Sequence, residues 1–129
     1  MQYMYDLDLV LDILEDMIDA SKKITTRCNK IKSADNFLEN EETQIVLDSI
    51  CMQLIAIGEA VKEIDKITNK ELLQKYKQIE WKKVAGIRDI LSHHYFDLNA
   101  EIVFSVCTDH IQNLKNTLIT IQKDLNETR

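Results

Sequence analysis

The sequence predicts an all-α protein, an antiparallel bundle of about five helices in a single domain over residues 1–129. Two observations carry this prediction. The 129 residues include two glycines and no proline, so little interrupts long helices. Apolar residues also recur every three or four positions along most of the chain, which is the spacing of one helix face. A chain of this length can bury one hydrophobic core, and we expect no second domain.

The first long helix is expected from Leu7 to Ile31, followed by a turn over residues 33–42. The turn stretch breaks the apolar period and is rich in Asp and Asn. Phe37 and Leu38 within it are expected to fold back onto the core. The apolar face of the helix comprises Leu7, Leu11, Leu14, Ile18, Ser21, Ile24, Cys28 and Ile31.

A second helix, antiparallel to the first, is expected from Glu42 to Ile67. It contains Gly58, and glycine inside a helix costs up to about 1 kcal/mol relative to alanine. We interpret Gly58 as the point where another helix approaches closely, in preference to a hinge. The apolar face comprises Leu47, Ile50, Leu54, Ile57, Val61 and Ile64.

The next segment is expected to begin with a capping box at Thr68 and Glu71, which would start a short helix. A turn near Gln78 and a further helix from Trp81 to about His93 are expected after it, because the apolar pattern resumes there and then stops.

The last helix is expected to begin near Asn99. Its apolar face includes His110, which we therefore interpret as a core histidine and leave out of the site. The near-3.5-residue spacing on the first, second and last helices is typical of helices that pair between chains, and it predicts a homodimer. This last face comprises Val103, Val106, His110, Leu114, Thr117, Ile121 and Leu125.

The sequence favours a cytoplasmic protein without a membrane segment. No apolar run approaches the roughly 20 residues needed to cross a bilayer, and the acidic N-terminus lacks the basic region of a signal peptide. The three cysteines, Cys28, Cys51 and Cys107, lie far apart in apolar runs, which is typical of buried, reduced thiols.

The charge of the chain is unevenly distributed. The net charge is −6, which argues against nonspecific coating of nucleic acid. Residues 62–88, however, carry a net charge of +4, while residues 1–61 carry −7 and residues 89–129 carry −3. Any phosphate-binding surface should involve Lys62 to Arg88, although a solvated lysine-rich helix pair has the same composition.

The residues with the clearest chemical potential are Arg88, His93, His94 and Tyr95, which fall within eight positions at a predicted helix end. Histidine can exchange protons with a ribose hydroxyl and a leaving oxygen, and arginine can bind a phosphate through two hydrogen bonds. On residue chemistry alone, Arg88 can equally serve a structural ion pair with Asp89 or Glu59.

The spacing Arg88-x4-His93-x-Tyr95 resembles the motif of HepT-type toxins of the HEPN superfamily. Two further segments are similar to that family: one on the second predicted helix and one that surrounds the motif. The resemblance therefore covers essentially the whole chain. The similar segments are Ile57-Gly58-Glu59-Ala60-Val61-Lys62 and Trp81, Gly86-Ile87-Arg88 with Tyr95-Phe96.

This resemblance implies a metal-independent endoribonuclease with no cofactor, acting as a homodimer and belonging to a type VII-like toxin–antitoxin pair. Arg88 would bind the scissile phosphate, and His93 would act as general base on the 2′-hydroxyl, leaving a cyclic phosphate. The resemblance also implies a minimal nucleotidyltransferase antitoxin that attaches AMP to Tyr95. RNA, the second copy and this antitoxin are thus the expected partners.

Several alternatives remain open on the sequence alone. His94 occupies the variable position of the motif and can replace His93 as base or face solvent. Glu59 can orient Arg88 or His93, or form a structural salt bridge. The whole cluster can also belong to a non-catalytic subunit that binds nucleotide or a nucleotidyltransferase, or to a purely structural helical scaffold.

One geometric constraint bears on the motif. On a continuous helix, His93 would lie about 140° around the axis from Arg88, so the two residues would not share a face. Either the helix ends before His93, or the pair is completed across a dimer.

Overall fold

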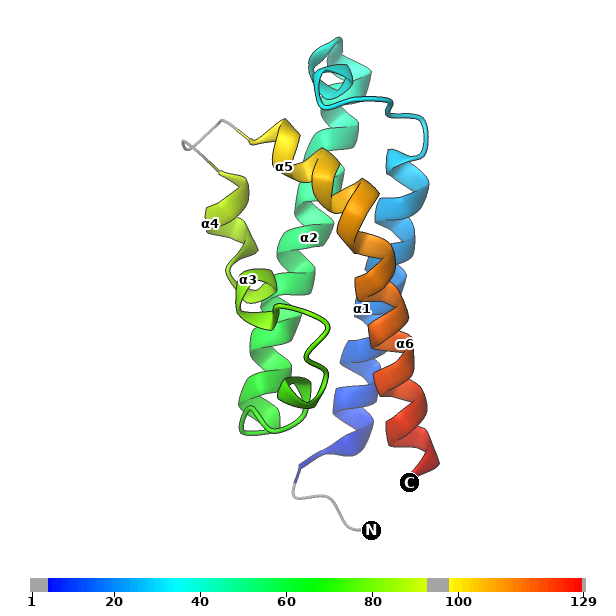
Figure 1. The fold of residues 1–129 in the computed structure, drawn as a ribbon, viewed down its shortest axis with the longest axis vertical. Helices are drawn as coiled ribbons and strands as arrows, with labels where there is room; N and C mark the ends of the chain where they lie inside the picture. The colour runs from blue at the N-terminus through cyan, green and yellow to red at the C-terminus, as the bar shows by residue number, and fades with distance from the viewer. Residues whose placement is uncertain (1–4, 93–97, 129) are drawn as a thin grey trace.

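A computed structural model describes residues 5–92 and 98–128, and their regular structure is helical. Three long helices run side by side along the molecule, and shorter helices cover one side of α2 (Figure 1). The predicted all-α antiparallel bundle is confirmed. The α-helices are α1 (Leu7–Cys28), α2 (Glu41–Ile67), α3 (Trp81–Ala85), α4 (Ile87–Leu91), α5 (Ala100–Ser105) and α6 (Ile111–Glu127).

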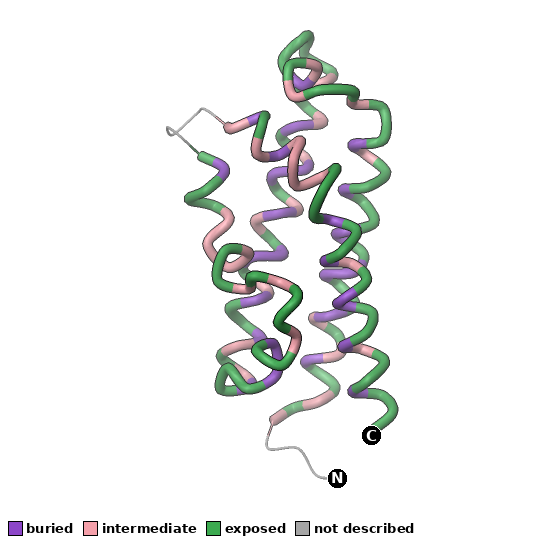
Figure 2. The backbone as a smooth tube through the Cα atoms, in the orientation of Figure 1, coloured by how far each residue is buried: buried purple, intermediate pink, exposed green. Residues whose placement is uncertain are grey.

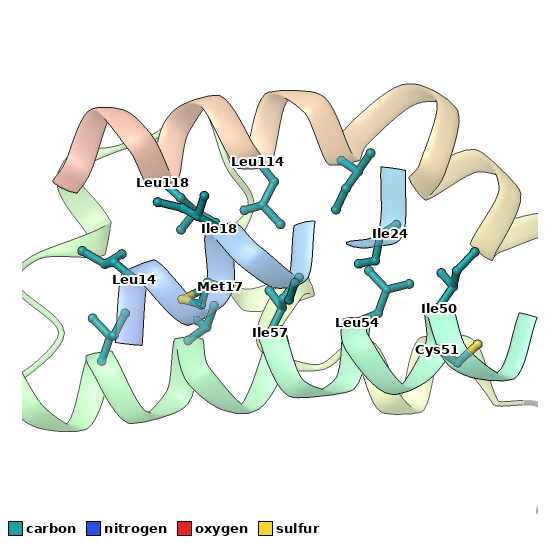
Figure 3. Packing of buried hydrophobic residues seen from close by; sticks show 14 of the residues in the cluster. Leu14, Met17, Ile18, Ile24, Ile50, Cys51, Leu54, Ile57, Leu114 and Leu118 are labelled. Atoms are coloured by element: carbon teal, nitrogen blue, oxygen red, sulfur yellow. The ribbon is translucent and has the colours of Figure 1, made fainter. Parts of the chain in front are cut away.

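The hydrophobic core lies between α1, α2 and α6. Each helix turns its predicted apolar face inward, so that buried positions recur along one side of each tube in Figure 2. Figure 3 shows Leu14 and Ile18 of α1 in the layer between the α2 and α6 ribbons, with Ile57 on the α2 side and Leu118 on the α6 side. Burial of these large side chains removes apolar surface from water and is the main stabilising contribution.

The first helix and the turn after it agree with the prediction except in two respects. Asp6 caps α1 by accepting a hydrogen bond from the backbone N–H of Leu9 at 3.1 Å, and the helix ends at Cys28, three residues before the expected end. The short 3₁₀ helix η1 (Asp35–Leu38) then buries Phe37 completely. Leu38 is 55% exposed, so its predicted place in the core is wrong.

The second helix begins with a capping box that pairs Asn40 with Thr43. The capping box predicted at Thr68 and Glu71 is wrong. Thr68 instead ends α2, and both its backbone N–H and its hydroxyl donate to the carbonyl of Ile64. Asn69 and Lys70 then adopt positive φ angles of 53° and 62°, which terminate the helix.

The predicted helix from Trp81 to His93 is divided. Gly86 separates α3 from α4, and α4 ends at Leu91. Upstream, where a short helix was expected, the chain forms only the 3₁₀ turn η2 (Leu73–Lys75). The indole of Trp81 donates to the carbonyl of Tyr76 at 2.9 Å, which joins η2 to the start of α3.

The predicted last helix contains an irregular segment. Asn99 caps α5, so the helical stretch begins close to the expected position, but the π-helical segment η3 (Val106–His110) precedes α6. A π-helical turn contains an extra residue and changes the rotation of the residues after it. Ile111 is therefore buried and His110 is exposed, so the interpretation of His110 as a core histidine is wrong.

The helix α2 is long and apolar enough, by length and composition alone, to cross a membrane. This corrects the expectation that no apolar run approaches that length. In the structure, 39% of its most apolar window is buried inside the molecule, and core helices of soluble proteins meet the same criterion.

Gly58 is the contact point between α2 and the α3–α4 pair. A Cβ atom at this position would lie 2.7 Å from the carbonyl oxygen of Val84 and 2.9 Å from a side-chain methyl of Ile87. The sequence-based interpretation of Gly58 as a packing glycine is therefore confirmed. By contrast, a Cβ atom at Gly86 would meet no atom closer than 3.5 Å.

We expect the substitution Gly58→Ala to destabilise the protein by about 1–3 kcal/mol, because the added methyl group overlaps a backbone oxygen that cannot rotate away. Urea denaturation monitored by circular dichroism would measure this change. Gly86→Ala is the matched control, and its free energy of unfolding should stay at or above the wild-type value. Equal stability of the two variants would contradict the packing role of Gly58.

Candidate functional site

Arg88 lies on α4, on the side of α2 that faces away from α1 (Figure 1). Its side chain is exposed, and within residues 5–92 and 98–128 it forms no ion pair or hydrogen bond. The structural ion pair with Asp89 or Glu59 that the sequence left open is therefore not formed in this part of the chain. An exposed guanidinium retains its donors for an anionic ligand.

The position of Arg88 is set by its neighbours on α4. Leu91 is 1% exposed and anchors the end of the helix in the core. Ile87 packs against Gly58 of α2, where the absence of a side chain allows the two helices to approach. Because α4 has only five residues, these two contacts determine which way Arg88 points into solvent.

The end of α4 resolves the geometric constraint found in the sequence. Ser92, the residue after the helix, has extended backbone angles of φ −106° and ψ 121°. It forms an isolated antiparallel bridge with Leu98, and the N–H of Asn99 donates to the carbonyl of Leu91 at 2.7 Å. The helix thus ends before His93, so Arg88 and His93 are not required to occupy opposite sides of one continuous helix.

His93, His94 and Tyr95 lie outside the described residues. Their chain positions are nevertheless bounded on both sides, since Ser92 and Leu98 are held together. The structure therefore describes one residue of the predicted motif, Arg88. It also describes Ser92 and Leu98, the residues that precede and follow the segment containing the others.

Glu59 lies near Arg88 but pairs with another residue. Its carboxylate accepts a hydrogen bond from Lys62 at 2.8 Å, and both side chains are more than half exposed. This hydrogen bond and the charge of Lys62, followed by the charge of Arg88, lower the pKa of Glu59. These three residues are called the 59–62–88 cluster, and Lys62 is also the first residue of the predicted basic segment.

An apolar groove of about 430 Å³ lies beside α4. Leu54 and Ile57 of α2 line it together with residues of α3, α4, α5 and α6, including Ile87 and Ile90, which flank Arg88 in the sequence. His110 also lines the groove. The sequence did not indicate this groove, because it depends on the division of α3 from α4 and on the π-helical segment.

The charged side chains that line the groove carry both signs. Lys83 lines the groove and pairs with Glu80 at 3.0 Å, and Glu80 and Glu101 also line the groove, whereas the residues of the 59–62–88 cluster do not. Among the residues that the structure describes, no group of three His, Cys, Asp or Glu side chains is arranged to hold a metal ion. The guanidinium of Arg88, which pairs with no carboxylate of the described residues, can bind a phosphate.

Comparison with known proteins identifies the family of this chain. Residues 14–121 match the family model described as Ribonuclease HepT-like. The protein of Methanocaldococcus jannaschii named "Putative RNase MJ0127" is 32% identical over 95% of this chain and 87% of its own length. The Thermococcus cleftensis protein named "Probable ribonuclease HepT" is 29% identical over 87% of this chain and 94% of its own length.

No solved structure matches this chain. The family model nevertheless covers α2 through α5 completely, together with most of α1 and α6. The matched region contains Gly58, Arg88 and the residues on both sides of the bridge between Ser92 and Leu98. The chain therefore belongs to the ribonuclease HepT-like family of the HEPN superfamily.

Proposed function

We propose that this protein is a metal-independent endoribonuclease, the toxin of a type VII-like toxin–antitoxin pair, and that it acts in the cytoplasm. The observation that carries the proposal is the exposed guanidinium of Arg88 on α4, which pairs with no carboxylate of residues 5–92 and 98–128, in a chain of the ribonuclease HepT-like family. RNA is the proposed substrate. The names of the relatives support ribonuclease activity, and the proposed chemistry depends on this chain's own residues.

In the proposed reaction, Arg88 binds the scissile phosphate and stabilises the charge that develops on its oxygens. His93 accepts the proton of the adjacent 2′-hydroxyl, and the 2′-oxygen attacks phosphorus. The bond from phosphorus to the 5′-oxygen breaks, and an imidazolium returns a proton to that oxygen. The products are a 2′,3′-cyclic phosphate and a 5′-hydroxyl end, so no bound metal is needed to balance the reaction.

Tyr95 is the proposed site at which a minimal nucleotidyltransferase antitoxin attaches AMP. The phosphate of this AMP would lie seven residues along the chain from Arg88, in the region where RNA phosphate should bind. Added bulk and negative charge would then block RNA binding. The exposed cations Arg88 and Lys62 support this assignment, since they can attract the triphosphate of ATP as well as RNA.

The sequence predicted a homodimer from the apolar faces of the three long helices. We propose that the homodimer forms through another surface, the outer face of α2. The apolar faces of α1, α2 and α6 are occupied within the chain. The outer face of α2, however, exposes Ile45 by 59% and Met52 by 64%, one heptad apart. Exposed apolar residues at this spacing are typical of helices that pair between subunits.

The alternative function is a non-catalytic subunit that binds nucleotide or docks a nucleotidyltransferase. The apolar groove beside α4 favours it, because a groove of this volume with a few polar residues at its edge can hold a ligand or a partner's side chains. The two functions differ in a direct test of RNA cleavage.

We expect the wild-type protein to cleave a mixed RNA pool in the presence of a chelator. Arg88→Ala should reduce the rate by about 10²–10³-fold through loss of phosphate charge stabilisation. His93→Ala should reduce it by about 10²–10⁴-fold through loss of the base. Gel electrophoresis of RNA would measure the rates, and His94→Ala would distinguish the two histidines.

The matched control is Lys123→Ala, which removes an exposed cation from α6 outside the predicted basic segment and should leave the rate unchanged. Circular dichroism would establish that each variant is folded. Intact RNA after incubation with folded wild-type protein, shown by mass to be unmodified at Tyr95, would contradict the ribonuclease proposal and favour the binding subunit.

Incubation with the proposed nucleotidyltransferase and ATP should add the mass of AMP to the wild-type chain and not to Tyr95→Phe. Intact-mass spectrometry would measure this. Tyr76→Phe is the control, because Tyr76 lies outside the Arg88-x4-His93-x-Tyr95 motif in the sequence. The hydroxyl of Tyr76 donates a hydrogen bond to Asp124 at 2.7 Å. An AMP increment that persists in Tyr95→Phe would exclude Tyr95 as the acceptor.

The variant Met52→Glu should be monomeric and should lose RNA cleavage, because a carboxylate would be buried in the proposed interface between α2 helices. Light scattering coupled to gel filtration would measure the mass in solution. The control Ile119→Glu changes a residue of α6 that is 41% exposed, and it should keep the wild-type mass. A wild-type protein that is itself monomeric would overturn the dimer.

A further inference from the structure

The apolar groove beside α4 borders the segment that carries His93 and Tyr95 of the predicted motif. Ile90 lines the groove two residues before Ser92, and Glu101 lines it three residues after Leu98. Because Ser92 and Leu98 are bridged to each other, the chain enters and leaves the motif segment within three residues of the groove lining. A molecule that reacts at this segment therefore has the groove beside it.

The groove has a buried apolar floor and aliphatic sides. Leu54 and Ile57 of α2 are buried at its base, and α4 and α5 both pack on α2 (Figure 1). The short helices on either side of the groove contribute branched aliphatic side chains, which pack well against flat apolar surfaces. These side chains are Val84, Ile87 and Ile90 of α3 and α4, and Ile102 and Val106 of α5 and η3.

Two features of the groove are typical of a ligand site. Ile90 is 38% exposed and lines the groove, although it is a large apolar residue. The first and last residues of the π-helical segment, Val106 and His110, also line the groove. Single π-helical turns within α-helical stretches occur frequently at functional sites.

Glu101 gives the groove an uncompensated negative charge. Its carboxylate is exposed and forms no ion pair or hydrogen bond with the side chains that the structure describes. The other acidic residue of the lining, Glu80, already pairs with Lys83. An ionised carboxylate accepts hydrogen bonds through two oxygens and donates none. The groove therefore repels a phosphate and suits an uncharged ligand that presents N–H donors.

We propose that the groove binds one base of the RNA substrate, and that Glu101 accepts hydrogen bonds from the Watson–Crick edge of that base. Guanine is the preferred base, because it presents two neighbouring N–H donors on this edge, whereas uracil presents one. Bases of single-stranded RNA are commonly recognised through this edge. The inference rests on the proposed ribonuclease function, to which it adds a base preference and the residue that determines it.

The size of the groove and the distribution of charge around it fit a nucleotide. A volume of about 430 Å³ is that of a small-molecule site, and apolar side chains commonly pack on the faces of an extruded base. Arg88 does not line the groove, but it lies on the same five-residue helix as Ile87 and Ile90, which do. A phosphate at Arg88 would thus lie next to the groove, while the uncharged base occupies it.

The test uses guanosine 3′-monophosphate and uridine 3′-monophosphate, which contain no phosphodiester bond to cleave. Each is added to the folded, full-length chain labelled with ¹³C at the isoleucine methyl groups, and NMR spectra are recorded. Guanosine 3′-monophosphate should shift the methyl resonances of Ile87, Ile90 and Ile102 and leave that of Ile119, on α6 outside the groove lining, unchanged. Its affinity should exceed that of the uridine nucleotide about tenfold.

The variant Glu101→Gln should bring the two affinities to within about threefold of each other, because the amide oxygen replaces two charged acceptors. Glu127→Gln is the matched control, since Glu127 is an exposed carboxylate of α6 outside the groove lining, and it should keep the tenfold preference. Circular dichroism would establish that both variants are folded.

Unchanged resonances of Ile87, Ile90 and Ile102 in the wild-type protein would overturn the base site, as would equal wild-type affinities for the two nucleotides. Cleavage of RNA by a protein with either result would leave the ribonuclease proposal intact. A guanosine preference that depends on Glu101, in a protein that leaves RNA intact, would support the base site and contradict the ribonuclease proposal.

Discussion

The approach of α2 to the α3–α4 pair at Gly58 controls how the outer helices of this protein are placed. The carbonyl oxygen of Val84 and a methyl group of Ile87 occupy the volume that any side chain at residue 58 would need. Two helices of five residues each are too short to be stable by themselves. They form helices because they pack closely against α2 at Gly58. The exposed position of Arg88 is a consequence of that contact. A residue buried in α2 thus determines the geometry of a surface cation.

The electrostatics of the candidate site contrast with those of the whole chain. An acidic protein repels RNA at long range, so productive contact depends on a local concentration of positive charge. The 59–62–88 cluster provides such a concentration, but Glu59 is already bound to one of its cations. An incoming phosphate would compete with Glu59 for Lys62, whereas at Arg88 it would displace no carboxylate of the described ranges. Because both side chains of the Glu59–Lys62 pair are more than half exposed, this pair is a weak competitor for an incoming phosphate.

Much of the fold was predictable, because the regular apolar faces of three long helices indicate which sides are buried. The packing role of Gly58 was also predictable, since glycine inside a long helix is costly unless another element packs against it.

The predictions that were wrong failed for local physical reasons. Thr68 has the residue types of a helix start, but its hydroxyl bonds backward to α2. His110 fits a regular apolar period, but a π-helical turn rotates it outward. The apolar spacing in the sequence does not reveal where a helix contains such an extra residue. At the site, spacing in the sequence identified Arg88, whereas the groove required contacts between distant segments.

The closure of the chain on both sides of residues 93–97 depends on main-chain groups, namely the bridge of Ser92 with Leu98 and the hydrogen bond from Asn99 to Leu91. Main-chain groups are the same whichever amino acids are present, so this closure places few demands on the identity of the five residues between its ends. Substitutions within residues 93–97 can therefore leave the hydrogen bonds that close this segment intact.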